Sequence, residues 1–480
     1  MYLILIIPLV VSVLSFVIKK SMRTMSLIVL ASSLIELIFV FCIVLEVFAN
    51  GPRTISSYFA IDYLGAIVLL IIGTVGCAVQ WYSIGYLKSE MAKKIIGFNR
   101  VRQYFVLTNL FIFAMLFSAV TTNPILLWIA IEATTLSTAF LISFYNKPTA
   151  LEAAWKYLII NSVGLLLAFF GTLLFSYPAL NSGHTILINW NILLANAGTI
   201  DPFIAKVAFI FILIGYGTKM GLVPMHTWLP DAHSKAPAPV SSLLSGVLLN
   251  VAFLAILRFK VLSDVMVGPK FSQDLLIAFG LLSMLVAAFI ILVQKNYKRL
   301  LAYSSIEHMG IIALGFGFGG VGAFAALLHM MYHSLAKSIL FLSAGNIFLK
   351  YSSTKIVNIR GMLRVLPTTS IVLIIGFLAI TGVPPFGIFL TEFSILSAGI
   401  TAHPLVVVLA LFAMALVFIG FLMHVISMIF GEKEESIAQG EASGTIAPIV
   451  VLVIIFITLS VYIPPALHDA IGNVAGIMPL

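Results

Sequence analysis

Long apolar runs separated by short polar connections fill nearly the whole of this 480-residue chain. A helix rises about 1.5 Å per residue, so a bilayer core about 30 Å thick needs about 20 consecutive apolar residues. Runs of this kind predict fourteen membrane-spanning helices. The predicted spans are residues 2–18, 26–48, 59–86, 104–121, 123–145, 150–177, 203–222, 238–258, 272–293, 300–318, 321–349, 367–399, 404–430 and 446–467.

The composition supports this pattern and excludes a soluble domain. Hydrophobic residues make up 61% of the chain and charged residues 9%, and the mean hydropathy is +1.17. Such values are typical of an all-α polytopic membrane protein, and we treat residues 1–480 as a single membrane domain. No basic residue precedes the first run, residues 2–18, and it has no small-residue cleavage pattern, so we expect a retained span and not a signal peptide.

The basic residues indicate which way the chain crosses the membrane. The 26 Lys and Arg outnumber the 17 Asp and Glu, but they are scattered among short connections, which argues against binding of nucleic acid. Most lie in odd-numbered connections, whereas the even-numbered connections hold only Arg53, Arg258, Lys260 and Lys270. The positive-inside rule therefore places the odd connections in the cytoplasm and, for an even number of spans, both termini outside.

The seventh predicted span ends in a stretch that combines a lysine with helix-breaking residues, Gly217-Thr-Lys-Met-Gly-Leu-Val-Pro224. Proline lacks an N–H and clashes with the carbonyl four residues back, so Pro224, with Gly221 before it, should break the helix. Inside a membrane such a break is tolerated only where protein or water surrounds it. We therefore interpret Lys219, beside the break, as part of an ion site.

A second stretch repeats this arrangement in the twelfth predicted span. Gly382-Val-Pro384-Pro385 follows an apolar run, as the first break does. Glu132 and Glu307 each follow an isoleucine two spans before the corresponding break. These matched features predict an internal repeat.

The repeat divides the chain into two units of five spans. The first unit is residues 104–258 and the second is residues 272–430, with residues 2–86 before them and residues 446–467 after them. Because five is an odd number, the second unit is predicted to be inverted in the membrane relative to the first.

Glu132 and Lys219 are expected to form a pair in the first unit. A charge at the bilayer centre costs about 2.5–3.5 kcal/mol on insertion scales, so such residues need polar surroundings or each other. A buried lysine holds its proton mainly while a carboxylate is near, so moving that carboxylate would release the proton. The alternative is a static structural ion pair.

The eleventh predicted span carries His329, His333 and Lys337 at i, i+4 and i+8, which places them on one helix face. We call these three residues the histidine row. Imidazole titrates near neutral pH, so the row, together with Ser334 and Ser338, could form a proton wire. The alternative is that each histidine is only satisfied by a nearby hydroxyl or carbonyl group.

Five further charged or polar residues lie within the spans. Glu307 and His308 are neighbours on a helix, so at most one should face the histidine row. Glu392 follows the second break by one to two turns and is interpreted as the last carboxylate of the series. Lys156 and Lys206 are secondary candidates; Lys206 could instead extend its amine to the membrane surface.

The two cysteines give no sign of a metal or redox centre. Cys42 and Cys77 lie singly in apolar runs, without the paired spacing that Fe–S, zinc or disulfide sites use. His226, Asp231 and His233 have a loose metal-ligand spacing, but the prolines around them favour a turn. We therefore expect no cofactor, no metal and no catalytic redox centre in this chain.

A long motif resembles the signature of the antiporter-like proton-pumping subunits of respiratory complex I, the Mrp antiporters and membrane-bound hydrogenases. It is Lys219-Met-Gly-Leu-Val-Pro-Met-His-Thr-Trp-Leu-Pro-Asp-Ala-His-Ser-Lys-Ala-Pro237. In finer detail, residues 131–140, 151–157 and 302–310 resemble the F subunit of hydrogenase-4 and its relatives. The resemblance covers nearly the whole chain.

The resemblance implies fourteen core helices, two inverted five-helix repeats and broken seventh and twelfth helices. It also implies partners, namely other membrane subunits and a peripheral Fe–S hydrogenase or dehydrogenase arm. The residues to which it assigns ion translocation are Glu132, Lys219, His329, His333, Lys337 and Glu392.

One position departs from the pattern of the family. Where many members have a lysine in the eighth helix, this chain has Asn250. An amide does not titrate, so Asn250 can only hold water or an ion by hydrogen bonds. The connection between the halves would then depend on water or on Glu307 and His308.

These observations favour an ion-translocating subunit of a redox complex, in which partner subunits transfer electrons. An Mrp-type Na⁺/H⁺ antiporter subunit and a membrane anchor that does not pump remain alternatives. Carboxylates and hydroxyls serve H⁺ and Na⁺ alike, so the sequence leaves the ion open.

Overall fold

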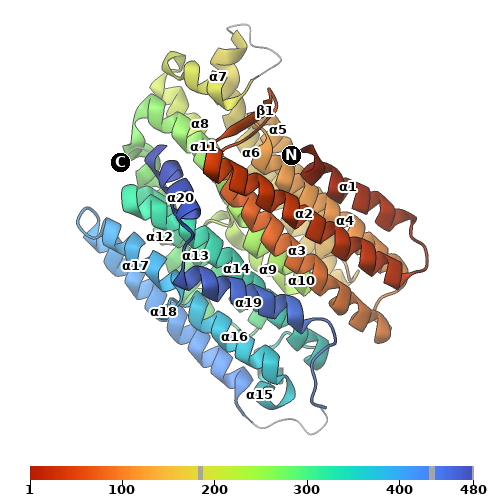
Figure 1. The fold of residues 1–480 in the computed structure, drawn as a ribbon. Helices are drawn as coiled ribbons and strands as arrows, with labels where there is room; N and C mark the ends of the chain where they lie inside the picture. The colour runs from red at the N-terminus through yellow and green to blue at the C-terminus, as the bar shows by residue number, and fades with distance from the viewer. Residues whose placement is uncertain (182–187, 432–437, 478–480) are drawn as a thin grey trace.

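The computed structural model describes residues 1–181, 188–431 and 438–477, and almost all of them are helical (Figure 1). The first half of the chain forms α1 (Tyr2–Val17), α2 (Met22–Asn50), β1 (Arg53–Ser56), β2 (Phe59–Ile61), α3 (Tyr63–Ala92), α4 (Phe98–Val120), α5 (Pro124–Ile142), α6 (Pro148–Asn181), α7 (Trp190–Ala195), η1 (Ala197–Thr199), α8 (Pro202–Met220), η2 (Met225–Thr227) and α9 (Trp228–Lys235). The rest forms α10 (Ala238–Leu243), η3 (Leu244–Leu248), α11 (Leu249–Val267), α12 (Pro269–Leu292), α13 (Tyr297–Phe318), α14 (Gly320–Tyr351), η4 (Ile356–Asn358), α15 (Met362–Val365), α16 (Pro367–Ile380), α17 (Gly387–Gly399), α18 (Pro404–Ile429), α19 (Ile446–Val461) and α20 (Pro465–Ile477).

Every predicted span overlaps a helix or a pair of helices, which confirms an all-helical polytopic chain. Within the described ranges, 11 helices are long and apolar enough to cross a membrane, or 12 if α19 and α20, bent by 73°, form one span. Helices α1, α16 and α17 are apolar but shorter. The count of fourteen spans therefore stays a prediction.

Local sequence signals set several helix starts. Asn123 accepts hydrogen bonds from the backbone N–H groups of Ile125 and Leu126, and Pro124 occupies the first helical position of α5. Asp201, followed by Pro202, caps α8 in the same way. A capping oxygen satisfies N–H groups that have no partner within the helix, and proline loses nothing there because it has no N–H.

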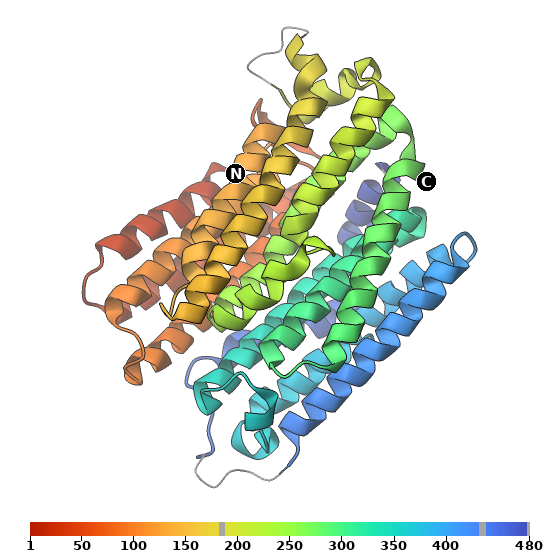
Figure 2. The same ribbon diagram turned by 180° about the vertical axis from the view of Figure 1, so that it is seen from behind.

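The helices form a bundle whose centre is α10, α11, α13 and α14. The apolar stretches of α11, α13 and α14 are wholly buried, whereas only about a third of those of α2 and α18 is buried. Figures 1 and 2 show α1 to α4 (red and orange) on one flank and α17 and α18 (blue) on the other. A helix that is apolar on its outer side and exposed in an isolated chain is suited to contact lipid or a partner helix.

The structure has both predicted breaks. Helix α8 ends at Met220, and Gly221 (φ +86°) turns the chain before α9 begins at Trp228. Helix α16 ends at Ile380, and Gly382 (φ +66°) turns the chain before α17 begins at Gly387. Only glycine adopts such positive φ angles at no steric cost.

Side chains satisfy backbone groups that the breaks release. Trp228 donates from its indole N–H to the carbonyl of Thr218 at 2.8 Å, and the backbone N–H of Val223 donates to the Ser283 hydroxyl at 3.0 Å. At the second break, the N–H of Gly387 donates to the hydroxyl of Ser460 at 3.0 Å. Protein thus surrounds both breaks, as a break at membrane depth requires.

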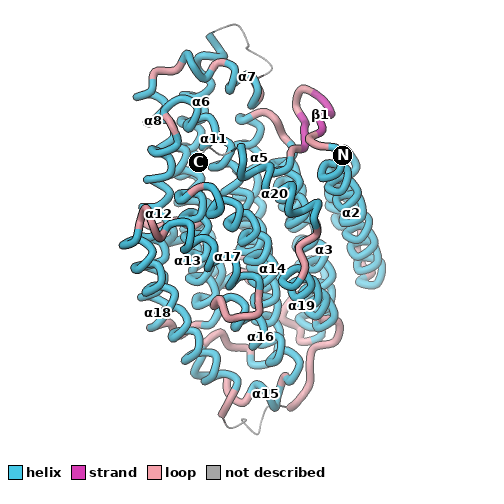
Figure 3. Tube along the Cα trace, turned by 60° about the vertical axis from the view of Figure 1, so that its left-hand side comes forward, coloured by secondary structure: helices cyan, strands magenta, loops and turns pink. Residues whose placement is uncertain are grey.

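The N-terminus and α20 lie at the same end of the bundle. Figure 3 shows both at the end that carries β1 and α7, with α15 at the opposite end. A chain that crosses the membrane an even number of times has both of its ends on the same side. The assignment of this end to the outside rests on the basic residues alone and stays a prediction, as does the inverted relation of the two repeats.

Candidate ion-translocation site

Lys219 lies in the last turn of α8 and is fully buried beside the first break. Its amine donates hydrogen bonds to the Thr135 hydroxyl of α5 at 2.8 Å and to the Tyr157 hydroxyl of α6 at 2.6 Å. The amine also lies 4.7 Å from the centre of the Tyr157 ring. Three helices therefore meet at this amine, and oxygen atoms replace part of its hydration.

Glu132 lies one turn before Thr135 on α5, but it makes no direct ion pair with Lys219 among the described contacts. One carboxylate oxygen accepts a hydrogen bond from Ser162 at 3.1 Å, and the other is buried without a partner in the described part of the chain. The charge of Glu132 nevertheless acts on the amine of Lys219, so the pairing of these two residues stays a prediction.

Asn250 joins the first half of the chain to the histidine row. Its amide N–H₂ donates to the Ser334 hydroxyl of α14 at 2.7 Å and to the carbonyl of Gly246 at 3.1 Å. Its amide oxygen and both ring nitrogens of His333 are buried without a hydrogen-bond partner among residues the structure describes. Buried polar atoms of this kind are usually satisfied by ordered water, so this region is suited to hold it.

His308 is the neighbour that reaches the histidine row. Its Nδ1 lies 2.9 Å from Nε2 of His329, and its ring centre lies 5.4 Å from that of His333. Glu307 points beside it, with one carboxylate oxygen 3.4 Å from Nε2 of His308. At most one of the two adjacent residues was expected to face the row, and His308 is the one that does. Glu307 contacts His308.

The hydrogen bonds of the two histidines have one consistent direction when both rings are neutral. Nε2 of His308 lies 2.8 Å from the carbonyl of Ile380, which can only accept, so this nitrogen donates. Nδ1 of His308 then accepts from Nε2 of His329, and Nδ1 of His329 accepts from the Thr391 hydroxyl at 2.8 Å. A proton added at Nδ1 of His329 can therefore leave from Nε2 of His308, where a carboxylate oxygen of Glu307 lies 3.4 Å away.

Two buried charged groups, Lys337 and Glu392, lie near this chain of hydrogen bonds. The amine of Lys337 donates to the carbonyl of Leu301 at 3.0 Å and to the Ser304 hydroxyl. Glu392 is buried next to the second break, and ligand atoms of Glu392, His308 and His329 lie within 4.8 Å of one another. Such a donor set also suits a metal ion, but here the facing ring nitrogens bond each other.

Lys156 and Lys206 are not brought into this series. Lys156 is half exposed and pairs with Glu152 at 2.6 Å and Asp231 at 3.6 Å. Lys206 is exposed in the second turn of α8, and its amine lies 5.7 Å from the ring centre of Phe271. Both lie near a helix start, where the long stem lets the amine reach water at the membrane surface.

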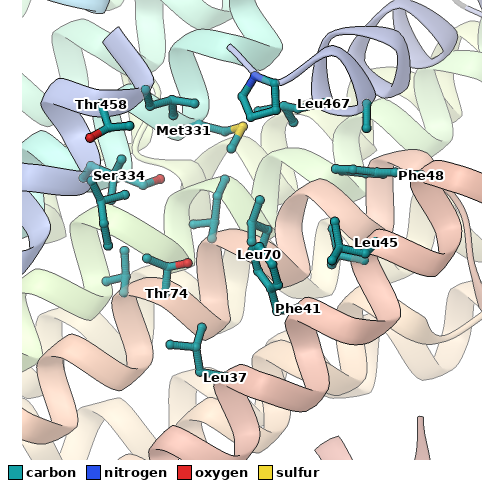
Figure 4. Close-up of a pocket in the computed structure, with 18 of the residues that line it drawn as sticks. Leu37, Phe41, Leu45, Phe48, Leu70, Thr74, Met331, Ser334, Thr458 and Leu467 are labelled. Atoms are coloured by element: carbon teal, nitrogen blue, oxygen red, sulfur yellow. The ribbon is translucent and has the colours of Figure 1, made fainter. Parts of the chain in front are cut away.

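An apolar cavity of about 620 Å³ lies on the other side of α14 (Figure 4). It lies between α2 and α3 on one side and α19 and α20 on the other, and Met331, Ser334 and Leu335 of α14 line it. Ser334 also accepts the hydrogen bond from Asn250, so this residue contacts both the cavity and the buried polar residues beside the histidine row. The histidine row itself faces α13 and is turned away from this cavity.

Sequence reasoning missed the hydroxyl groups that hold the charged residues. Tyr157, Thr135 and Thr391 contact Lys219 or His329, yet in the sequence they are ordinary members of apolar spans. A usable signal was their spacing, since Thr135 follows Glu132 by three residues and Thr391 precedes Glu392. Glu90 and Lys298 were missed because they were placed in connections, whereas both are buried in helices.

Comparison with known protein families agrees with this architecture. A family model described as NADH:quinone oxidoreductase/Mrp antiporter, TM, matches residues 121–420, which is more than half of the chain. The chain belongs to this family. A second model, NADH-Ubiquinone oxidoreductase (complex I), chain 5 N-terminus, matches residues 48–94 of this antiporter-like subunit.

Individual relatives extend the similarity over nearly the whole antiporter-like subunit. It is 38% identical over 417 residues to the hydrogenase-4 component F homolog of Methylacidiphilum infernorum, covering 85% of this chain and 86% of that protein. A subunit of the archaeal membrane-bound sulfane sulfur reductase has the same fold, with a TM-score of 0.87, 24% identity and coverage of 99% and 96%. So has a subunit of the Mrp complex from Dietzia sp. DQ12-45-1b, with a TM-score of 0.83, 17% identity and coverage of 99% and 96%.

Proposed function

We propose that this chain is the proton-translocating membrane subunit of a multi-subunit redox complex, and that it moves protons while partner subunits transfer electrons. Its family and its relative named a hydrogenase-4 component F homolog support a hydrogenase-linked complex. We place it in the plasma membrane of a prokaryote with both termini outside. The basic residues of the odd connections support this orientation.

The observation that carries the proposal is the buried contact of two imidazoles between two carboxylates. Glu392 lies beside His329, His329 bonds His308, and His308 lies beside Glu307. Imidazole accepts a proton at one nitrogen and releases one at the other, so this order suits proton transfer across the second half of the chain. Lys219 and Glu132, with Asn250 between the halves, extend the series into the first half.

Electron transfer is assigned to partner subunits. We expect other membrane subunits and a peripheral arm with Fe–S centres, of the hydrogenase or dehydrogenase type. Purification of the complex with a tag on this chain tests the assignment, because redox partners should copurify with it. Recovery of membrane partners alone would favour an Mrp-type Na⁺/H⁺ antiporter, and ion uptake that requires Na⁺ would support the same alternative.

The histidines provide the direct test of transport. Replacing both His329 and His333 by alanine should slow proton uptake by native membrane vesicles by about a hundredfold, the usual contribution of a positioned proton-transfer group. The yield of intact complex should change little, because the substitutions remove groups that transfer protons and not groups that assembly needs. His468→Ala, at an exposed position on α20, is the matched control. Normal uptake by the double variant would instead support an anchor that does not pump.

A further inference from the structure

A polar pocket lies apart from the histidine row, at the end of the bundle where the basic connections meet. It has a volume of about 230 Å³ and lies where the α5–α6 and α9–α10 connections and the connection after α14 come together beside the start of α13. A water molecule takes up about 30 Å³ of liquid, so the pocket has room for several. Residues with polar groups on its wall include Tyr86, Tyr145, Lys147, Lys235 and Lys298.

Lys298 lines this pocket and is nevertheless almost fully buried, at 4% exposure. Its amine donates one hydrogen bond to the carbonyl of Ala236 at 2.5 Å. An ammonium group has three N–H donors, so two are left for the pocket. Lysines at helix starts normally reach solvent with a long stem, and a buried one needs a polar environment or a counter-charge.

Glu90 supplies a carboxylate behind the pocket wall. It is fully buried in the last turns of α3 and accepts a hydrogen bond from the Tyr145 hydroxyl at 2.6 Å. Tyr145 in turn lies 2.9 Å from the Tyr86 hydroxyl. The second oxygen of Glu90 has no partner within the described residues, and the positive charge of Lys298 acts on this carboxylate. Lys298 on the pocket wall thus has a buried carboxylate behind it as a counter-charge.

The first turns of α13 lead from the pocket to the histidine row. Lys298, Leu301 and Ser304 recur at i, i+3 and i+6, so they lie on one face of α13. Lys337, at the end of the row, donates to the carbonyl of Leu301 and to the Ser304 hydroxyl. A rise of about 1.5 Å per residue puts these two contacts about 4.5 and 9 Å along the helix from Lys298.

A further buried group lies between the two lysines. The ring of His233 stacks on Phe341 at 4.8 Å, and Phe341 lies one turn after Lys337 on α14. In the same segment, Ala236 binds Lys298. Both ring nitrogens of His233 are buried without a partner in the described structure, so the space between the lysines contains polar groups that water would satisfy.

We propose that this pocket is where the buried row exchanges protons with water at the basic end, and that Lys298 carries the proton between them. The proposal rests on the function proposed above. In each cycle the Lys298 amine gives one proton to a buried acceptor on the way to the histidine row and takes one from water in the pocket. Transport in the other direction reverses these two transfers, and no electrons move in either case. Glu90, held by Tyr145, is the counter-charge that keeps the site polar in both states.

Substitution of Lys298 separates this role from a structural one. Lys298→Arg keeps the positive charge beside Glu90, but a guanidinium does not readily give up its proton. We expect the variant complex to assemble and its proton uptake by vesicles to fall by about tenfold or more. Lys295→Met, which removes an exposed lysine three residues earlier in the connection before α13, should leave uptake unchanged. Normal uptake by an assembled Lys298→Arg complex would overturn the proposal.

A second measurement tests the pocket without altering a charge. Thr149→Cys places a thiol at an exposed position on the pocket wall, in a Cys42→Ser background. A bulky water-soluble thiol reagent should then block proton uptake, whereas the same reagent on Asn99→Cys, exposed at the same end, should not. Full uptake after complete labelling at residue 149 would exclude the pocket as the route. If the His329 and His333 variant still stops uptake, the proposed function stands and only the route is wrong.

Discussion

Hydroxyl groups, and not a direct ion pair, hold the amine of Lys219 in the first half. The sequence identified Lys219 and Glu132 because a charge within an apolar run is costly and rarely accidental. It could not identify Tyr157 and Thr135 as the contacts of the amine, because those contacts depend on how α5, α6 and α8 pack. The same limit applies to Glu307 and His308, whose orientation depends on the rotation of α13.

Lys219 gives the sharpest prediction at this scale. Lys219→Ala removes the amine on which Thr135 and Tyr157 converge and leaves Glu132 without a nearby positive charge. Lys219→Arg restores charge, but the larger guanidinium must fit between the same two hydroxyls and does not readily release a proton. Both variants should assemble, and both should lose proton uptake by about a hundredfold.

Proton uptake by vesicles that contain each purified variant complex provides the measurement. Lys206→Ala is the matched control, because Lys206 lies on the same helix with its amine exposed and should tolerate the change. A Lys219→Arg complex that pumps freely would show that the position needs only a positive charge. The titrating role of Lys219 would then have to be given up.

At the scale of helices, the length of the apolar runs predicted nearly all elements, and a glycine followed two or three residues later by a proline located both breaks. The ends of helices were predicted less well. The sequence map ends the third span at residue 86, whereas α3 continues to Ala92 and takes Glu90 into the protein. Lys88 of that last segment is exposed whereas Glu90 is buried, and hydropathy alone does not distinguish such a partly buried segment from an aqueous connection.

The second break should be sensitive to the smallest added side chain. Gly382 has φ +66°, and a Cβ atom there would collide with a carboxylate oxygen of Glu392. Gly382→Ala should therefore combine backbone strain of about 1–2 kcal/mol with displacement of Glu392. Gly268→Ala carries the same kind of strain at φ +94°, but a Cβ atom there meets nothing within 4 Å.

Comparison of these two alanine variants separates strain from chemistry. Both should lower the thermal unfolding temperature of the complex by a few degrees, since about 1 kcal/mol corresponds to a shift of this size. Only Gly382→Ala should also slow proton uptake, because only that change displaces Glu392. Equal uptake by the two variants would show that the position of Glu392 against the break does not matter.

At the scale of the whole molecule, the bundle has two chemically different ends. One end carries β1, α7, the N-terminus and α20; the other carries α15 and the polar pocket with Lys298. The sequence predicted this division from the distribution of Lys and Arg. It could not place the pocket, which requires three connections far apart in the chain to meet. If the positive-inside rule holds here, the pocket faces the cytoplasm.

Single cysteines test this orientation, in a background in which the exposed Cys42 is replaced by serine. Ser57 and Asn191 are exposed at the β1 and α7 end, and Asn99 and Val357 are exposed at the other end. A thiol reagent that does not cross membranes should label Ser57→Cys and Asn191→Cys only from outside. It should label Asn99→Cys and Val357→Cys only from the cytoplasmic side.

Two positions are tested at each end because a partner subunit that covers one of them would block its labelling. Intact cells and inverted vesicles expose opposite faces of the membrane, so each variant should react in one preparation and not in the other. Labelling from the opposite side at both ends would show that the bundle has the opposite orientation in the membrane. The pocket at Lys298 would then exchange protons with the outside and not with the cytoplasm, and uptake through it would run in the opposite direction.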